Sequence, residues 1–461
     1  MSKVQNFREI APNLPFTEYN FYDLYRKTFE NSELGRMKKL LPLHEMAVNF
    51  GLDRNAPYKK RGRKSFFTPE GKVALMVLKM KTGLSMPKLM EALNGNIHYQ
   101  MFCDIAINPQ QPLTNYKVLD NIAMELASEL KMQQQQEIIA QAWKPYMKDL
   151  DTMYTDGTCY ESEMRFPTDQ KLLWECIEKS YESMCDVSGR LKTTRPRTKH
   201  LEVAKANMAY VKQRKHTRVQ TRKILRRELA LLGKILCEIR RMIRENADTA
   251  SLSPGEANQL EIITKVYRQQ SSHFDINDPR ESVPDRIVSV SKPYVRPIVR
   301  GKEVKSVEFG AKCNNIMVDG ISFIEKLSFN AFNEGTRLKH CIKMCKRLFG
   351  EDVTKIGGDT GYAGTANRDF CKEKGIQISF VNRGRPAIEK KEKDIVRQEL
   401  ARVRATAMEG SFGTQKEHYD LRRIKARRKL TEILYIFFGI HTANVVQLAD
   451  RQTVQQLAMA S

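Results

Sequence analysis

The stretch VTKIGGDTGYAG, residues 353–364, is most informative about the fold, because a short strand-like tetrapeptide, VTKI, runs directly into a glycine-rich loop. Residues 353–356 have strand character, and a helix near 367–374 and a strand at 376–381 are predicted to follow. This alternation makes the last third of the chain α/β. Ligand sites of such sheets lie beyond the carboxyl ends of strands, which is where Asp359 falls. The alternative is an ordinary strand-to-helix loop, and no Gly-Lys-Ser or Gly-Lys-Thr follows to cradle a phosphate.

A second acid, Asp156, lies in MYTDGTCY, residues 153–160. Residues 152–166 have the pattern of two short strands around Asp156 and Gly157, which predicts a hairpin. Gly157 would let a backbone and a ligand approach closely, so a carboxylate at this strand end could point into a cleft. The alternative is a turn aspartate that binds only its own backbone.

A third acid, Glu409, lies in RVRATAMEGSFGTQK, residues 402–416, within a long helix predicted from about residue 391. Lys416 follows at a helical spacing and could hold a phosphate, although most glutamates in such helices are only solvated. Carboxylates are the ligands that Mg²⁺ prefers, and two ions about 4 Å apart can clamp the attacking and leaving oxygens of a phosphodiester. Asp156, Asp359 and Glu409 therefore suggest a metal-dependent centre that processes DNA.

Charge and length set the broad class. The chain has 461 residues and a formal net charge of +24, from 78 Lys and Arg against 54 Asp and Glu. Such an excess favours a polyanionic partner, and nucleic acid fits better than a membrane because the basic residues are spread through long polar helices. The length predicts two or three domains.

Cysteines and apolar runs argue against a secreted or membrane protein. The nine cysteines show no disulfide framework, and MSKVQNFREIAPNL lacks the apolar core of a signal peptide, so we expect reduced thiols inside the cell. The best apolar run, residues 433–440, is too short and too soon followed by His441 and Asn444 to span a bilayer. We expect it to be a buried helix.

The first part of the chain, residues 21–130, has a helical pattern that predicts a small all-α module. Thr68 and Pro69 mark a helix start, and Gly83 separates this helix from a second one near residues 87–93. The pair could form a helix-turn-helix, or it could belong to an ordinary helical bundle. A basic run at 59–64, with Arg61, Arg63 and Lys64, could contact phosphates.

The middle of the chain is helical from about 171 to 246. Apolar residues there recur at spacings of four and three, as in a coiled coil, at Leu225, Leu229, Leu232, Leu236, Ile239 and Ile243. The opposite face is basic and could be solvated or contact DNA. Residues 254–301 are predicted to be irregular. Strands at 304–317 and 321–329 should form a hairpin at Asp319 and Gly320, before a helix that ends near residue 349.

Together these motifs resemble the DDE transposases of bacterial insertion sequences of the IS4 and IS5 types (IS1182-like). The resemblance rests on the three acids, on GDTGY at 358–362, on EGSFGTQK at 409–416 with YDLRR at 419–423, and on RIVSVSKPYVRPIVRGK at 286–302 with EFGAK at 308–312. It covers nearly the whole chain. Such enzymes often carry Arg four residues before the Glu and Lys seven after it. Lys416 fits, whereas Ala405 stands at the Arg position and Arg404 is displaced by one.

The resemblance implies an RNase H-like α/β fold: a mixed sheet with the first Asp on the first strand, the second beyond the fourth strand, and the Glu on a late helix. A helical insertion would separate the second and third strands, and an all-α DNA-binding domain would precede the sheet. We expect this domain at 1–145, the catalytic domain at 146–169 and 301–447, the insertion at 170–300, and a tail at 448–461.

It also implies a transposase that binds terminal inverted repeats and catalyses strand cleavage and strand transfer. Asp156, Asp359 and Glu409 would hold two Mg²⁺ ions, with Mn²⁺ also possible, and Lys416, Arg422 and Arg423 would position the DNA backbone. The partners would be double-stranded DNA, both transposon ends and target, and a second copy of the chain, in the cytoplasm at the nucleoid. The alternatives are an inactive, transposase-derived DNA-binding protein and an RNase H-like structure-specific nuclease.

Other site chemistries are less well supported. No histidine has Arg three residues later, as a tyrosine recombinase needs, and no HisXxxHis relaxase motif occurs. His340, Cys341 and Cys345 could suggest zinc, but no second ligand pair is nearby and a buried helix face is the better interpretation. The segment RGRP at 383–386 could enter a minor groove or be a plain loop.

Overall fold

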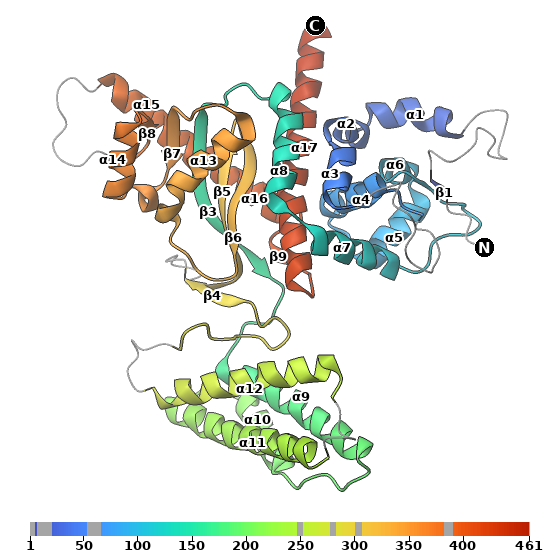
Figure 1. The fold of residues 1–461 in the computed structure, drawn as a ribbon, viewed down its shortest axis with the longest axis vertical. Coiled ribbons are helices and arrows are strands. Elements are labelled where there is room, and N and C mark those ends of the chain that lie inside the picture. Colours follow the sequence, from blue (N-terminus) through green and yellow to red (C-terminus); the bar gives the residue numbers. More distant parts are fainter. Residues whose placement is uncertain are drawn as a thin grey trace. The chain divides into compact units, whose positions relative to one another are not determined.

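A computed structural model of the chain describes residues 5–6, 21–52, 66–246, 252–276, 283–299, 307–381 and 391–460. These residues form two compact units. The first comprises Met1–Ser162, Ala311–Ser328 and Phe332–Ser461, and the second comprises Glu163–Gly310 with Phe329–Ala331. Each unit is described by itself below (Figure 1).

The N-terminal part of the first unit is helical, as predicted. Its helices are α1 (Phe21–Asn31), α2 (Glu33–Leu40), α3 (Leu43–Asn49), α4 (Pro69–Thr82), α5 (Met86–Gly95), α6 (Ile97–Phe102), α7 (Lys117–Glu129) and α8 (Met132–Trp143), the last followed by the short η1 (Lys144–Tyr146). Two-residue strands, β1 (Gln5–Asn6) and β2 (Ile105–Ala106), pair antiparallel.

Helices α4 and α5 begin and end where the sequence indicates. Thr68 caps α4 by accepting a hydrogen bond from the Gly71 N–H at 2.9 Å, and Gly83 ends it with a left-handed φ of 62°. Helix α4 is buried along most of its length, whereas α5 exposes Pro87, Lys88 and Glu91. The helix-turn-helix interpretation therefore stays a prediction for α5. The basic run with Arg61, Arg63 and Lys64 lies outside the described residues, as does RGRP at 383–386.

A mixed sheet forms the rest of the first unit. Its strands are β3 (Thr152–Ser162), β5 (Val307–Val318), β6 (Ile321–Ser328), β7 (Lys355–Gly358) and β8 (Gln377–Ile378), in the spatial order β6-β5-β3-β7-β8. Strands β5 and β6 are antiparallel, whereas β7 is parallel to both β3 and β8. The predicted hairpin is confirmed, with Asp319 and Gly320 at φ 46° and 78°, the left-handed values that a tight hairpin turn requires.

Two short strands extend the ladders. Strand β4 (Arg296–Val299) pairs antiparallel with residues 307–310 of β5, all within the second unit. Strand β9 (Arg423–Ile424) runs parallel to the end of β3, opposite Glu161 and Ser162.

The hairpin predicted at 152–166 is wrong, because β3 is one continuous strand through Asp156 and Gly157. The local Asp-Gly turn signal is overridden by pairing with β5 and β7, and Gly157 does not adopt a positive φ. Asp156 therefore lies within a strand and not at its end. The helical segment follows the first long strand of the sheet, so its expected position between the second and third strands is also wrong.

Helices pack around the sheet of the first unit. They are α13 (Leu338–Phe349), α14 (Thr365–Glu373), α15 (Lys391–Val403), α16 (Glu409–His418) and α17 (Lys429–Ala460), with short turns η2 (Glu334–Arg337), η3 (Thr360–Tyr362) and the π-helical η4 (Arg404–Met408). Among the described residues one helix, over Lys429–Val454, is long and apolar enough to cross a bilayer, and 83% of its apolar window is buried within the protein. The predicted burial of residues 433–440 is confirmed.

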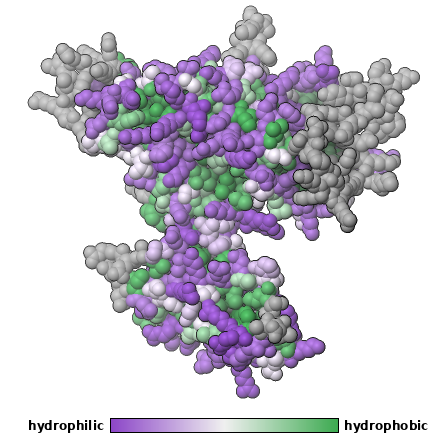
Figure 2. All heavy atoms as spheres, in the orientation of Figure 1, coloured by the Kyte–Doolittle hydropathy of each residue, from purple (hydrophilic) through white to green (hydrophobic). Residues whose placement is uncertain are grey.

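The second unit contains a bundle of α9 (Asp169–Arg190), α10 (His200–Lys212), α11 (Arg218–Glu245) and α12 (Pro254–Asp275). Leu232, Leu236 and Ile239 of the predicted seam are buried in the bundle core, so the seam packs within this chain. The irregular region predicted from residue 254 is wrong at its start, because Ser253 and Glu256 form a capping box that begins α12. Figure 2 shows hydrophilic side chains over much of the visible face of this bundle.

One acid lies inside the bundle. Glu228 of α11 is 0% exposed, and neither of its carboxylate oxygens has a hydrogen-bond partner among the described residues. Burial raises the pKa of Glu228 from its ordinary 4.5 to about 9, against a smaller lowering by the nearby Gln170 amide. The carboxyl is therefore protonated at neutral pH, and deprotonation opposes folding of the bundle.

Replacing Glu228 by Gln should stabilise the bundle in a pH-dependent way. Because the folded pKa is raised, the stability associated with Glu228 is present below pH 4.5 and is lost as the pH rises towards 9. At 1.36 kcal/mol per pH unit, the gain for E228Q should be about 3 kcal/mol at pH 7 and vanish near pH 4. Hydrogen exchange of the α11 amides, corrected for intrinsic rates, measures it. The exposed Glu245→Gln on the same helix is the control, and equal protection of E228Q and wild type at neutral pH would refute the assignment.

Candidate active site

The parallel register of β3 and β7 brings two of the predicted acids together. Thr152 pairs with Lys355, and the ladder continues in step to Thr155 opposite Gly358. The next residues along the two strands are Asp156 and Asp359. Since paired strands lie about 4.8 Å apart, the two backbones are neighbours at this level. Asp156 is 8% exposed and Asp359 is half-buried.

The two carboxylates are held differently by their local backbone. Asp156 Oδ1 accepts a hydrogen bond from the Gly157 N–H at 2.7 Å, and Asp359 Oδ1 accepts one from the Gly361 N–H at 2.9 Å. The second contact caps η3, so the loop that the sequence places after β7 orients its own acid. The role of Asp359 as a ligand stays a prediction, and the strand register accounts for its position beside Asp156.

Arg404 connects the acids electrostatically. Its Nη2 lies 2.6 Å from Asp156 Oδ2, and the two side chains are only 19% and 11% exposed. Burial disfavours the guanidinium charge, but the carboxylates of Asp156, Asp359 and Glu409 together raise the pKa of Arg404. The three acids named from the sequence therefore share one positive charge.

The site strongly favours positive charge. Burial and then the charge of Asp156 raise the pKa of Asp359 above its ordinary 3.8, whereas Arg404 lowers it. Glu334 contributes a further, smaller increase. A buried and a half-buried carboxylate at neighbouring positions, one in β3 and one directly after β7, are the donor type that a hard divalent cation prefers.

The π turn η4 explains the displaced arginine. Helix α15 passes into η4 at Arg404 and continues as α16 at Glu409. A π turn closes its hydrogen bonds five residues apart, one more than an α turn, and such turns occur often at functional sites. Arg404 is five residues before Glu409 and thus lies one π turn from it. In an α-helix, the residue one turn before Glu409 would be the one four positions earlier, Ala405. The one-residue displacement seen in the sequence is absorbed by the backbone.

Helix α16 is fixed on the sheet by its apolar side. Met408 and Phe412 pack with Met317 of β5, and Tyr154 of β3 covers the same cluster. Glu409, on the opposite side of this turn, is exposed. It is therefore the most peripheral of the three acids, and its contact with the site is through the charge of Arg404.

The predicted backbone-binding residues gather near the end of β3. Lys416 Nζ lies 5.9 Å from the ring centre of Tyr160, four residues after Asp156 on β3. The Arg422 N–H donates to the Lys416 carbonyl at 3.1 Å, and its guanidinium pairs at the surface with Glu417 at 3.2 Å. Arg423 is exposed and lies opposite Glu161 in the β9–β3 ladder.

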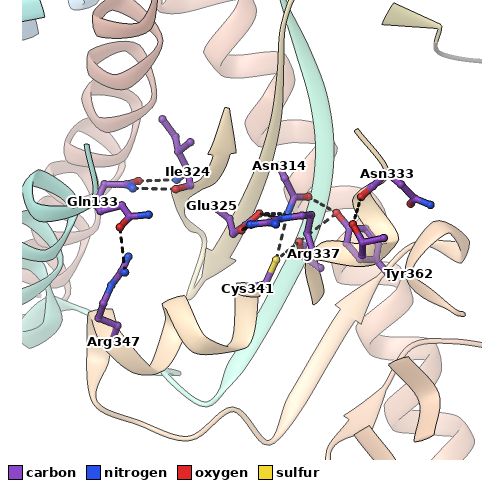
Figure 3. A network of polar contacts seen from close by, with 12 residues as sticks. Gln133, Asn314, Ile324, Glu325, Asn333, Arg337, Cys341, Arg347 and Tyr362 are labelled. Carbon is purple, nitrogen blue, oxygen red and sulfur yellow. Dashed lines mark hydrogen bonds and ion pairs between the residues drawn. The ribbon is translucent and has the colours of Figure 1, made fainter. Parts of the chain in front are cut away.

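A buried polar network supports the segments that carry the acids (Figure 3). Tyr362, three residues after Asp359, donates to Asn314 Oδ1, and Asn314 Nδ2 donates to Glu325 Oε2 at 2.9 Å. Arg337 binds Glu325 through both Nε and Nη2. Thr155, next to Asp156, donates to the Asn315 carbonyl at 3.1 Å. The strand β3 and the turns η2 and η3 are thereby tied to the same pair of strands.

Sequence reasoning did not identify two charged residues of the site. Arg404 was recognisable only as an arginine displaced from an expected spacing. Glu334 had no local signal: its carboxylate lies against Gly157 and pairs with Lys312 at 2.9 Å. The zinc alternative has no support among the described residues, where no three His, Cys, Asp or Glu side chains form a metal-binding group, and Cys341 and Cys345 are buried in α13.

Comparison with known proteins gives two matches. Residues 356–444 match the transposase DDE domain family, and residues 22–122 match a second transposase domain family. The first match contains Asp359, Glu409 and Lys416, the second runs from α1 into the first half of α7, and Asp156 lies outside both. The chain matches no curated protein and no solved structure. These matches confirm the resemblance to DDE transposases.

Replacing Arg404 by Gln should destabilise the first unit most at neutral pH. The pKa of Asp359 is raised in the folded state, so the stability associated with Asp359 is lost as the pH rises through that pKa. Arg404 lowers the pKa of Asp359, so removing Arg404 raises this pKa further. Leaving Asp156 without its partner should cost roughly 3 kcal/mol when the acids are ionised. Calorimetric unfolding at several pH values measures the loss.

The matched control is Arg402→Gln, because Arg402 pairs with Glu399 while 70% exposed and should contribute under about 1 kcal/mol. A loss in R404Q that is independent of pH, or no larger than that in R402Q, would contradict the shared-charge description.

Proposed function

We propose that this chain, which carries two transposase domains, is the DDE transposase of an insertion sequence: it binds the terminal inverted repeats, cuts the DNA and joins the freed strand to a target. The observation that carries the proposal is the β3–β7 register, which sets Asp156 beside Asp359. The second of these acids lies within the matched DDE domain. Transposases act on DNA, and the net charge of +24 agrees with such a partner.

The strand order supports an RNase H-like fold for the sheet of the first unit. Leaving out the two-residue and four-residue strands β9 and β4, the chain visits the strands as β3, β5, β6, β7 and β8, and their spatial order is third, second, first, fourth, fifth. Asp156 is then on the first strand, Asp359 follows the fourth, and Glu409 begins a helix after the fifth. This is the distribution that the family resemblance implies.

Asp156 and Asp359 fit the role of divalent-cation ligands, and Glu409 would complete the shell of one ion. Their fit rests on the neighbouring carboxylates, the raised pKa of Asp359 and the positive charge that the acids already share. Two Mg²⁺ ions, when bound, would activate the attacking oxygen and stabilise the charge on the phosphodiester. Arg404 would be free to pair with a backbone phosphate once cations neutralise Asp156.

The basic residues would position the DNA. Lys416, Arg422 and Arg423 lie together near the end of β3, so they would bind phosphates on one side of the acids. Arg61, Arg63 and Lys64 precede α4 in the second matched region and would contact the repeat ends. Bringing two ends together makes a homodimer at the nucleoid the expected assembly.

A second function, a DNA-binding protein without catalysis, is favoured by one observation. Asp156 is paired with Arg404 at 2.6 Å, and in the described part of the chain no three His, Cys, Asp or Glu side chains form a group that could hold a metal. Magnesium-dependent cleavage of an end-containing duplex distinguishes the two functions. An RNase H-like structure-specific nuclease would instead cut without regard to end sequence and would join no strands.

Isosteric replacement of the acids tests the proposed chemistry. Asp156→Asn, Asp359→Asn and Glu409→Gln should each reduce cleavage of a duplex that contains the element's end by about 10³-fold or more, because the three residues act as a unit. Binding of the same duplex, measured by gel shift, should persist. The control Glu399→Gln changes an exposed acid on α15 and should cleave like the wild type. Retained cleavage in one of the three variants removes that residue from the site.

A further inference from the structure

Glu334 lies directly against the strand that carries Asp156. A Cβ atom built on Gly157 would be 2.0 Å from Glu334 Oε1, 2.2 Å from its Cδ and 2.8 Å from Oε2. No side chain can occupy position 157 unless this carboxylate moves. Gly157 therefore makes room for the close approach of an acid from η2, and its backbone is not that of a left-handed turn.

The segment of Glu334 also touches the segment of Asp359. A Cβ on Gly335 would lie 2.3 Å from the Gly361 carbonyl oxygen, so η2 and η3 meet backbone to backbone. Asn367 fastens this contact by donating from Nδ2 to the Gly335 carbonyl at 2.7 Å and to the Tyr362 carbonyl at 2.9 Å. Glu334 is thereby placed between Gly157, which follows Asp156, and the turn that follows Asp359.

The polar network of Figure 3 holds the turn that carries Glu334 in place. Arg337, three residues after Glu334, is bound to Glu325 of β6, and Glu325 is linked through Asn314 to Tyr362 of η3. Asn314 and Tyr362 are each 0% exposed, and the side chain of Glu325 is 3% exposed. These contacts fix the segments that carry Glu334 and Asp359 before a ligand arrives, which is what a supporting shell of a binding site does.

Charge balance points in the same direction. Lys312 Nζ lies 2.9 Å from Glu334 Oε1, with side chains 14% and 17% exposed, and Arg404 holds Asp156 in the same way. The four carboxylates Asp156, Asp359, Glu334 and Glu409 carry four negative charges against the two positive charges of Lys312 and Arg404, which leaves two in excess. One divalent cation would balance this excess.

We propose that Glu334 becomes a fourth carboxylate ligand when a divalent cation binds at Asp156 and Asp359; without a cation, Glu334 and Asp156 are paired with Lys312 and Arg404, and the described side chains form no three-ligand group. The inference rests on the proposed function, since it adds a residue to that centre. Lys312 would then be the counter-ion of Glu334 in the free protein, as Arg404 is for Asp156. The competing explanation is that Glu334 and Lys312 form an ion pair that only fastens η2 to β5.

Binding of Mn²⁺ alone to the full chain, followed by the electron paramagnetic resonance signal of free Mn²⁺, tests the proposal without any catalytic step. The wild type should bind, and Asp156→Asn should lose binding. Glu334→Gln should weaken it by about 10-fold or more, the range expected for loss of a group that holds a metal. The control Glu351→Gln changes a half-exposed acid that pairs with Lys144 at 3.5 Å and should bind like the wild type.

Lys312→Gln separates a ligand from a structural ion pair. If Glu334 binds the cation, removing its competitor should leave Mn²⁺ affinity unchanged or increase it. Equal weakening in K312Q and E334Q would show a structural pair and overturn the proposal. Wild-type affinity in E334Q, with loss in D156N, would overturn it while leaving the site of the proposed function intact. Absence of binding by the wild type would refute both.

Discussion

The parallel pairing of β3 with β7 is the constraint on which the site depends. It joins residues that are about two hundred positions apart in the chain and sets their registers, so that Asp156 and Asp359 follow their strands at one level. Everything else in the site is arranged around this pair: Arg404 comes from the helical side, and Glu334 comes from the turn after β6. A slip of one residue in this ladder would move Asp156 out of step with Asp359.

The buried groups behind the pair explain why the site can hold so much charge of one sign. Burial and, after it, the like charge of Asp156 raise the pKa of Asp359. The repulsion between the acids is offset because Arg404 pairs with Asp156 and Lys312 pairs with Glu334. The hydrogen bonds of Asn314, Glu325 and Arg337 also hold the turns η2 and η3 in place.

Much of this arrangement was readable from the sequence where the signals are local. The strand before Asp359, its glycine loop, the Asp319 hairpin and the cap of α4 follow from turn and capping chemistry, and the structure has them. Long-range pairing decided the rest. The Asp-Gly pair of β3 has the local signal of a turn, but pairing with the neighbouring strands makes it part of a continuous strand. Ser253 caps a helix in a segment whose composition indicates irregular structure. Glu334 has no sequence signal, because only the fold brings it to Gly157.

The π turn at Arg404 has a consequence for how such sites tolerate insertions and deletions. A helix that holds one extra residue in a single turn can gain or lose that residue without rotating the next helix, since the widened turn takes up the difference. Removing one alanine between Arg404 and Glu409 would tighten the turn to an α turn and leave Arg and Glu facing the same way. The spacing between two functional residues in the sequence is therefore a poor guide here, whereas the number of helical turns between them is preserved.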